Sequence, residues 1–328
     1  MCTAFASPRL LLRLLLIFSF HQHQQVGFDQ VYVATNATDT AASINAKLAE
    51  GLHLVLTPGI YHLDAPIEVT QANTVVLGLG LATLVATAGN AVVEVGDVAG
   101  VRVAGILMQA GPVESPELMR VGTEGGGFAG DAANPVVLSD IFARVGGPDG
   151  LENNVMADTM VQVHSGHVVG DNFWLWRADH SSDGAVNGGF YPVNHGLQVH
   201  GDDVTMYGLA VEHTLQDLTQ WHGERGATYF YQSELPYDLD QADFGALNYT
   251  GYRVDTGVAS HEAHGVGVYS FFKTYHVTVE SGIVAPESAT FVHPFSVFLS
   301  GYGTIAHVLN DRGDSTGEGG NQTAYLCE

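Results

Sequence analysis

Two glutamates, Glu212 and Glu234, stand 22 residues apart, each at the end of an apolar strand-like run. This spacing is close to one coil of a β-solenoid, so we expect the two carboxylates on adjacent coils of one face. Carboxylates roughly 5 Å apart repel each other and raise one pKa, which makes a neutral acid available near neutral pH. Glycoside hydrolysis needs such an acid at the leaving oxygen, and a carboxylate that activates water or stabilises the oxocarbenium ion. We predict Glu234 as the general acid and Glu212 as its modulator; alternatively, both are solvated residues on outward strand faces.

Two further carboxylates are candidates for the same chemistry. Glu262 follows Glu234 by 28 residues and can join its face only if the loop at 238–251 absorbs the excess length. Asp179 lies on the coil before Glu212 and is an alternative acid, although a turn aspartate that bonds its own backbone is the competing interpretation. The predicted catalytic residues are Glu234, Glu212, Glu262 and Asp179.

Aromatic side chains near these acids are candidates for stacking on sugar rings. Trp176 and Glu212 occupy equivalent places when their coils are aligned. Strand alternation puts Trp174 and Trp176 on one face and Phe173 and Leu175 on the other, so one of the two pairs must be outside. Each aromatic is either exposed, where it would stack on a sugar, or part of the core. The predicted substrate-binding side chains are Trp176, Trp221, Tyr231, His180 and His213.

The 16 histidines raise the question of a metal site. Five of them cluster in the second half of the sequence: His200, His213, His222, His261 and His264. No spacing among them matches a zinc signature, and residues i and i+3 of a strand point to opposite faces. Exposed or hydrogen-bonded histidines are therefore the better interpretation. The sequence predicts no metal and no cofactor.

The elements that must position these residues repeat along the chain. Short strands with period-two alternation recur at 93–108, 161–176 and 197–212, separated by Gly, Asp and Asn turns. This pattern is typical of a parallel β-solenoid, in which successive coils stack about 4.8 Å apart. Spacing in the sequence then indicates which side chains are neighbours. We predict an all-β fold of this kind.

Changes in composition divide the chain into three segments. A signal-peptide-like segment at 1–26 precedes a parallel β-helix at 27–310, and a Gly- and Asp-rich flexible tail follows at 311–328. Residues 39–50 have the apolar spacing of one amphipathic helix. We expect this short N-terminal helix to cap the open end of the stack, whose edge would otherwise recruit other chains.

Composition excludes several classes of partner. The 328 residues include 40 glycines and only 14% charged residues, which favours turn-rich β structure. The net charge of -24 argues against nucleic acid and anionic membranes as partners, and against polyanionic substrates such as pectate. Cys2 and Cys327 are the only cysteines, so a disulfide framework is excluded.

The N-terminal segment resembles a secretory signal peptide. Arg9 and Arg13 border an apolar run that is too short to span a bilayer, and no later stretch is long enough. Asn-X-Ser/Thr sequons at Asn36, Asn248 and Asn321 are consistent with a secreted glycoprotein. We therefore predict an extracellular protein without membrane insertion.

Several longer motifs resemble those of one family of secreted bacterial and fungal proteins. These motifs lie at 56–63, 73–84, 174–180, 228–238 and 260–265. Members often carry the labels "coagulation factor 5/8 type domain" or "adenylyl cyclase", but no nucleotide-phosphate loop supports cyclase chemistry here. The family looks like pectin-lyase-like, single-stranded right-handed β-helices, with a layout similar to glycoside hydrolase family 55 exo-β-1,3-glucanases. The resemblance covers the chain from about Phe28 to Leu326.

The resemblance implies a glycoside hydrolase that cleaves a neutral β-glucan polysaccharide or oligosaccharide with inversion. It also implies a second component, because family members carry two tandem β-helices and this chain matches only the second. In such enzymes the cleft lies between the two helices, and the first contributes groups around the attacking water. The expected partners are therefore a glycan substrate and an N-terminal β-helix that is missing from this chain.

Two other functions remain open. A polysaccharide lyase needs a basic residue, for which Arg225 and Lys273 are central candidates, and often calcium. Unsaturated products that absorb in the ultraviolet would indicate it. A glycan-binding or cell-surface solenoid without catalysis is the second alternative, and glycan binding without sugar release would indicate that role.

Overall fold

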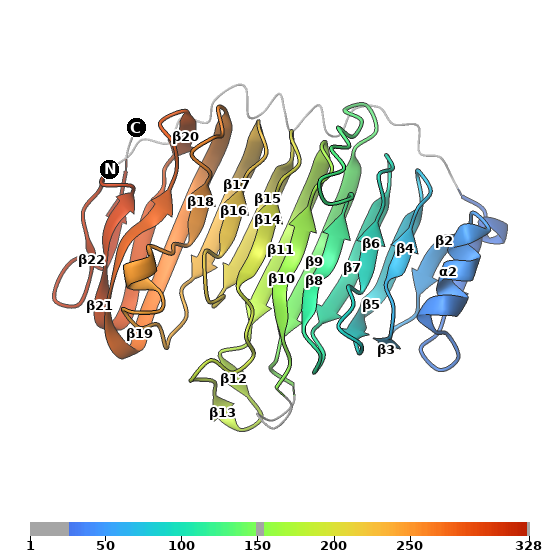
Figure 1. Ribbon diagram of the computed structural model, residues 1–328, viewed down its shortest axis with the longest axis horizontal. Coiled ribbons are helices and arrows are strands. Elements are labelled where there is room, and N and C mark those ends of the chain that lie inside the picture. The colour runs from blue at the N-terminus through green and yellow to red at the C-terminus, as the bar shows by residue number, and fades with distance from the viewer. Residues whose placement is uncertain (1–25, 149–153, 327–328) are drawn as a thin grey trace.

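The computed structural model of this chain describes residues 26–148 and 154–326, which are built almost entirely from stacked β-strands. In Figure 1 the stack runs from α2 and β2 at the blue N-terminal end to β21 and β22 at the red C-terminal end. The signal-peptide-like segment predicted at 1–26 lies, apart from Val26, outside the described residues. None of the helices described is long and apolar enough to cross a membrane.

The helices are η1 (Phe28–Gln30), α2 (Ala41–Ala49) and η2 (Gly245–Leu247). The strands of the first half are β1 (Val31–Ala34), β2 (His53–Leu56), β3 (Ile60–Leu63), β4 (Ile67–Val69), β5 (Val75–Ala86), β6 (Val93–Val95), β7 (Arg102–Gln109), β8 (Ser115–Val121), β9 (Val136–Val145), β10 (Ala157–Val163) and β11 (Val168–Arg177). Those of the second half are β12 (His180–Ser181), β13 (Gly184–Ala185), β14 (His195–Val199), β15 (Thr205–Glu212), β16 (Thr219–Trp221), β17 (Gly226–Glu234), β18 (Tyr252–Val254), β19 (His261–Val284), β20 (Ala289–Val292), β21 (Phe295–Leu309), β22 (Thr316–Gly317) and β23 (Thr323–Tyr325).

Strands of successive coils pair in parallel. In one ladder, Met119 of β8 faces Val161 of β10, which faces Leu197 of β14 and then Thr219 of β16. A second ladder runs through β7, β9, β11, β15, β17 and β19. This arrangement confirms the predicted stack of parallel strands and is consistent with a pectate-lyase-like β-helix.

Each strand of the second ladder bends once, at a residue whose φ lies between 52° and 70°. The bend residues stack on one another, since the register continues on both sides of them. They are Gly105, Asp140, Asn172, Gly208, Phe230 and Gly265. Glycine, and to a lesser degree Asn and Asp, adopts this left-handed conformation at low cost. Beyond the aligned bends, β7, β9, β11, β15 and β17 end at or next to one row of paired residues, from which the turns of the candidate site project, whereas β19 continues past it.

The inside of the stack is filled by the alternate apolar residues of each strand. In β11, Phe173 and Leu175 are buried while Trp174 is 44% exposed. The same alternation in β15 buries Leu209 and Val211. Because the strands are parallel and in register, these inward residues form continuous apolar columns, and the outward residues form columns of their own.

A helix caps the N-terminal end of the stack, as predicted. α2 begins with a capping box in which Ser43 N–H donates to the Thr40 hydroxyl and Thr40 N–H donates to the Ser43 hydroxyl. Ile44 and Leu48 are buried against the first coils. Asn45 fixes the helix to the beginning of β4, because its Oδ1 accepts from the Glu68 N–H at 2.9 Å and its Nδ2 donates to the Pro66 carbonyl at 2.8 Å.

The prediction of a flexible tail at 311–328 is wrong for the residues of this segment that the structure describes. β22 and β23 fold back and pair antiparallel with β21. The prediction failed because it was based on composition alone, whereas β21 presents an unpaired edge that these residues cover.

Candidate active site

One row of side chains crosses the coils where the strands of the second ladder end. Gln109 and Arg144 are paired in this row, and Arg144 is paired with Trp176 on the next coil. Trp176 in turn pairs with Glu212, and Glu212 pairs with Glu234. The predicted register of these last three residues is therefore confirmed.

The carboxylates of Glu212 and Glu234 share a partly buried patch in which one oxygen of each lies within 4.8 Å of the other. Burial, with the nearby charges of Glu212 and Asp179, raises the pKa of Glu234 to about 7, although a hydrogen bond from Tyr237 opposes the shift. Burial also raises the pKa of Glu212, whose Oε2 accepts from Trp174 Nε1 at 2.9 Å. Repulsion between the pair thus contributes as expected from the sequence, but burial is the larger cause.

His213 lies behind the two carboxylates and not on a surface that a sugar can reach. Its side chain is 2% exposed, and its Nε2 is 3.9 Å from Glu234 Oε2. Burial lowers the pKa of His213 to about 4, so the imidazole is neutral at neutral pH. The ring packs edge-on against Tyr237, with centroids 4.6 Å apart. The sequence prediction placed His213 near the correct chemistry, but direct contact with substrate is excluded by its burial.

Asp179 and His180 border the same patch. His180 Nδ1 and Asp179 Oδ1 are 2.9 Å apart, and the imidazole is 5.3 Å from the ring of Trp176. The charge of Asp179 contributes to the raised pKa of both Glu212 and Glu234, so the three carboxylates form one electrostatic unit. His180 is 65% exposed and is free to contact a ligand.

The exposed Trp174 and the partly buried Trp176 form the aromatic border of the patch. Their rings stack with centroids 5.7 Å apart. Phe173 and Leu175 are buried on the opposite face, which settles the choice between the two pairs. The tryptophans are therefore placed where a sugar ring could stack on them, directly beside Glu212.

Two predicted substrate-binding aromatics, Trp221 and Tyr231, lie in the core, and we exclude them from the site. Trp221 is fully buried and packs on His261, with ring centroids 4.9 Å apart. Tyr231 is 1% exposed, and its hydroxyl donates to the Gly251 carbonyl at 2.6 Å. The physical reason is alternation along β17: because Glu234 points outward, Tyr231 three residues earlier must point inward.

Glu262 does not join the other candidate acids. It pairs with Ala227 at the beginning of its strand, whereas Tyr269 pairs with Glu234. Its carboxylate contacts the His264 imidazole at 2.6 Å. The segment between β17 and β19 is longer than the prediction required, so a later residue of β19 reaches the row. The predicted place of Glu262 among the catalytic residues is therefore wrong.

Sequence reasoning missed two residues of the site. The Tyr237 phenol is hydrogen-bonded to Glu234, and burial together with that acid raises the pKa of the phenol. Arg177 is 2% exposed, and it donates to the carbonyls of Phe190 and His213 at 2.9 and 3.3 Å. Arg177 thereby joins two turns of the site. Because Arg177 directly follows Trp176, the sequence could have indicated that it belongs to the site. No spacing rule points to Tyr237.

Glu212, His213 and Glu234 are also able to hold a metal ion. Their ligand atoms lie within 4.8 Å of one another, and a neutral imidazole with two carboxylates is a common ligand set. No zinc spacing is visible in the sequence, because these ligands come from two coils. Other histidines form hydrogen bonds instead, through the pairs His222–Asp255, His261–Tyr252 and His264–Glu262.

The chain is similar in sequence to a known family and to a glucanase. Residues 31–234, more than half of the chain, match the model of the LAM55 pectate lyase-like domain. The chain is 42% identical over 301 residues to an exo-β-1,3-glucanase of Streptomyces sp. SirexAA-E, a match that covers 89% of this chain and 48% of the relative.

Solved structures of a Streptomyces sp. SirexAA-E protein, sacteLam55A, have the same fold. One is 42% identical to this chain, with a TM-score of 0.84, and the match covers 91% of this chain and 54% of that one. A second, of a variant in complex with glucose, is 40% identical and has the same TM-score. The chain spans about half the length of the relatives that it matches.

Proposed function

Because this chain belongs to the LAM55 pectate lyase-like domain family, we propose that it is a β-1,3-glucanase that uses Glu234 as its general acid. The observation that carries the proposal is the partly buried Glu212–Glu234 pair, with the pKa of Glu234 raised to about 7. The name of the Streptomyces relative supports the substrate class.

Glu234 in its protonated form donates to the glycosidic oxygen as the bond to the anomeric carbon breaks. Glu212, also partly buried, favours the protonated state of Glu234 and stabilises positive charge as it develops on the sugar ring. Their oxygens lie within 4.8 Å of one another, whereas the two catalytic carboxyls of inverting enzymes stand about 6.5–9.5 Å apart. This short separation argues against Glu212 as the base of an inverting pair, and because the resemblance implies inversion, we assign Glu212 the role of modulating the acid.

We infer that the water-activating group comes from a second β-helix that faces this one. The family resemblance implies this component, and the relatives are about twice as long as the region they share with this chain. In an inverting reaction the attacking water approaches the anomeric carbon from the side opposite the general acid, so a domain that faces Glu234 could hold it. The same resemblance favours two further proposals, namely that the protein is secreted and that its coils wind in a right-handed sense. Right-handed winding is usual for parallel crossover connections.

A neutral glucan fits the charge of the site. The ionised carboxylates beside the protonated Glu234 would repel a uronate, whereas carboxylate oxygens accept hydrogen bonds from sugar hydroxyls. The stacked Trp174 and Trp176 offer an aromatic border for an uncharged sugar face. This combination favours a glucan over the substrates of polysaccharide lyases.

The proposal is tested by replacing Glu234 with Gln, which keeps the size of the side chain and removes the transferable proton. In the protein that carries both β-helices, glucose release from laminarin is expected to fall by about 10²–10⁴-fold, the usual contribution of a general acid. Glu262→Gln is the matched control and should retain the wild-type rate, since Glu262 lies outside the site. Full activity of Glu234→Gln would reject the assignment, and ultraviolet-absorbing products would indicate a lyase.

A further inference from the structure

A pocket of about 450 Å³ lies among the turns that follow the candidate acids, and the mechanism above does not use it. This volume is within the range of ligand pockets in proteins. The side chains that decide its chemistry are Asp238, Asp240, Asp243, Leu247, Tyr249 and Tyr275. Asp238 follows Glu234 by only a few residues in the same turn, so the pocket adjoins the candidate active site.

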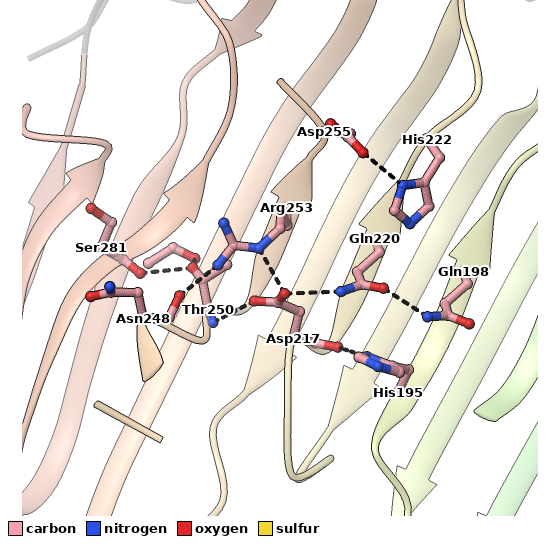
Figure 2. A network of polar contacts seen from close by, with 11 residues as sticks. His195, Gln198, Asp217, Gln220, His222, Asn248, Thr250, Arg253, Asp255 and Ser281 are labelled. Carbon is pink, nitrogen blue, oxygen red and sulfur yellow. Dashed lines mark hydrogen bonds and ion pairs between the residues drawn. The ribbon is translucent and has the colours of Figure 1, made fainter. Parts of the chain in front are cut away.

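Tyr249 lines the pocket, and its two neighbours in the chain, Asn248 and Thr250, belong to a polar network (Figure 2). Before Tyr249, the Asn248 carbonyl accepts from Arg253 Nη2 at 2.5 Å. After it, Thr250 N–H donates to Asp217 Oδ1 at 2.9 Å. Arg253 Nε also donates to Asp217 Oδ2 at 2.7 Å, and the Asp217 side chain is only 5% exposed. The network therefore holds Tyr249 in place before any ligand arrives.

A second part of the lining is fixed by Asp238. Its Oδ2 accepts from the Gly188 N–H at 3.1 Å, and its Oδ1 lies 3.6 Å from Arg177 Nη1. Arg177 also holds the turn that carries His213, so the same guanidinium supports both the candidate active site and the pocket. A pocket whose walls are already bonded loses little conformational entropy when it binds a ligand.

The lining selects a neutral, hydroxyl-rich ligand. Its charged side chains are all acidic, so an anionic ligand would be repelled, whereas carboxylates accept hydrogen bonds from hydroxyls. Tyr275 is 50% exposed and Leu247 is 55% exposed, and both offer apolar surface to the C–H face of a sugar. In the described part of the chain, the ligand atoms of Glu212, His213 and Glu234 lie close enough together to hold a metal ion, whereas those of the three pocket aspartates do not.

We propose that this pocket binds a glucosyl segment of the β-glucan chain at a distance from the bond that is cleaved. This inference rests on the proposed function, because the ligand is the substrate of the neighbouring acids. A chain long enough to occupy both places would bind more tightly than a disaccharide, since the second contact is then intramolecular.

The test compares the binding of laminarihexaose and laminaribiose by isothermal titration calorimetry. The full chain with Glu234→Gln serves as the background, so that the ligand is not cleaved. Adding Tyr275→Ala is expected to weaken laminarihexaose binding about tenfold, within the range for a central aromatic contact, and to change laminaribiose binding less. Tyr325→Ala removes a tyrosine of similar exposure from β23 and should leave both affinities unchanged.

A second variant and a metal titration complete the test. Leu247→Ala should weaken laminarihexaose binding in the same direction, and thermal unfolding confirms that each variant is folded. Unchanged affinity in both variants would overturn the proposal, as would calcium binding that is lost in Asp243→Asn. If wild-type protein that carries both β-helices releases no glucose but laminarihexaose binding depends on Tyr275, the pocket stands and the proposed hydrolysis fails. Normal glucose release with unchanged affinities would instead support the hydrolysis and reject the pocket as a glucan site.

Discussion

Glu234 is an acid that its surroundings keep protonated near neutral pH. Burial is the main cause of its raised pKa, and the charges of Glu212 and Asp179 add to it. The hydrogen bond from Tyr237 acts in the other direction because it stabilises the ionised carboxylate. The pKa of Glu234, about 7, thus results from opposing effects. Removing a single atom of a neighbouring residue can therefore shift it.

Removing the Tyr237 hydroxyl should shift the pH dependence of activity upward. In the wild type, kcat/KM is expected to fall by about tenfold per pH unit above pH 7, as Glu234 loses its proton. In Tyr237→Phe the carboxylate loses a stabilising donor, so the pKa of Glu234 rises and the decline begins at higher pH. The pH profile of laminarin hydrolysis measures this shift.

Tyr325→Phe is the matched control for that experiment, because Tyr325 lies on β23, away from the acids. Its profile should coincide with that of the wild type. A decline that moves to lower pH in Tyr237→Phe would show that the phenol does not act on the ionised form of Glu234.

At the residue scale, the sequence could predict strand register and alternation but not the positions of residues in irregular turns. The 22-residue spacing correctly aligned Glu212 with Glu234, since coils stack in register. Strand alternation could also have excluded Tyr231, which has the opposite parity to Glu234. Tyr237 could not be predicted, because it reaches Glu234 from an irregular turn whose path depends on the rest of the fold.

At the scale of elements, the bends of the second ladder are its most strained points. The other bend residues are Gly, Asn or Asp, whereas Phe230 has a large aromatic side chain. Its φ is 64°, and its side chain is 69% exposed. A left-handed conformation costs an ordinary residue about 1–2 kcal/mol, and an exposed ring regains little of this through packing.

Phe230→Asn is therefore expected to stabilise the fold by about 1 kcal/mol, which corresponds to a rise in Tm of about 1–3 °C. Thermal unfolding followed by circular dichroism measures the difference. The control is Ile60→Asn, which replaces an exposed apolar residue of β3 that has no positive φ and should lower Tm. A lower Tm for Phe230→Asn would show that the exposed ring makes contacts worth more than the strain.

The strands and α2 could be predicted because their apolar periods are local signals. The alternation of 161–163 and 173–176 and the capped pattern of 39–50 each specify one element. The pocket could not be predicted, since its walls come from separate turns and from the exposed part of β19. Their approach depends on loop paths that no local pattern encodes.

At the scale of the whole molecule, a stack of parallel strands must protect its two ends. α2 covers the first coil, and β22 and β23 pair along β21 at the other end (Figure 1). Composition could not show this second cap, because Gly- and Asp-rich segments are equally common in mobile tails.

Deleting residues 311–328 should expose β21 as an open edge and promote association between chains. Size-exclusion chromatography with light scattering is expected to show oligomers or aggregates where the full chain gives a smaller species. A truncated chain with the same mass distribution and the same Tm as the full chain would show that these strands add no protection.

Substrates that differ in their need for a proton test most directly whether Glu234 protonates the leaving group. The measurement is the ratio of wild-type to Glu234→Gln rates on laminarin and on 2,4-dinitrophenyl β-glucoside, whose leaving group departs without protonation. We expect a loss of about 10²–10⁴-fold on laminarin and of less than about tenfold on the activated glucoside. Equal losses on both substrates, or no loss on laminarin, would contradict the role of Glu234 as the general acid.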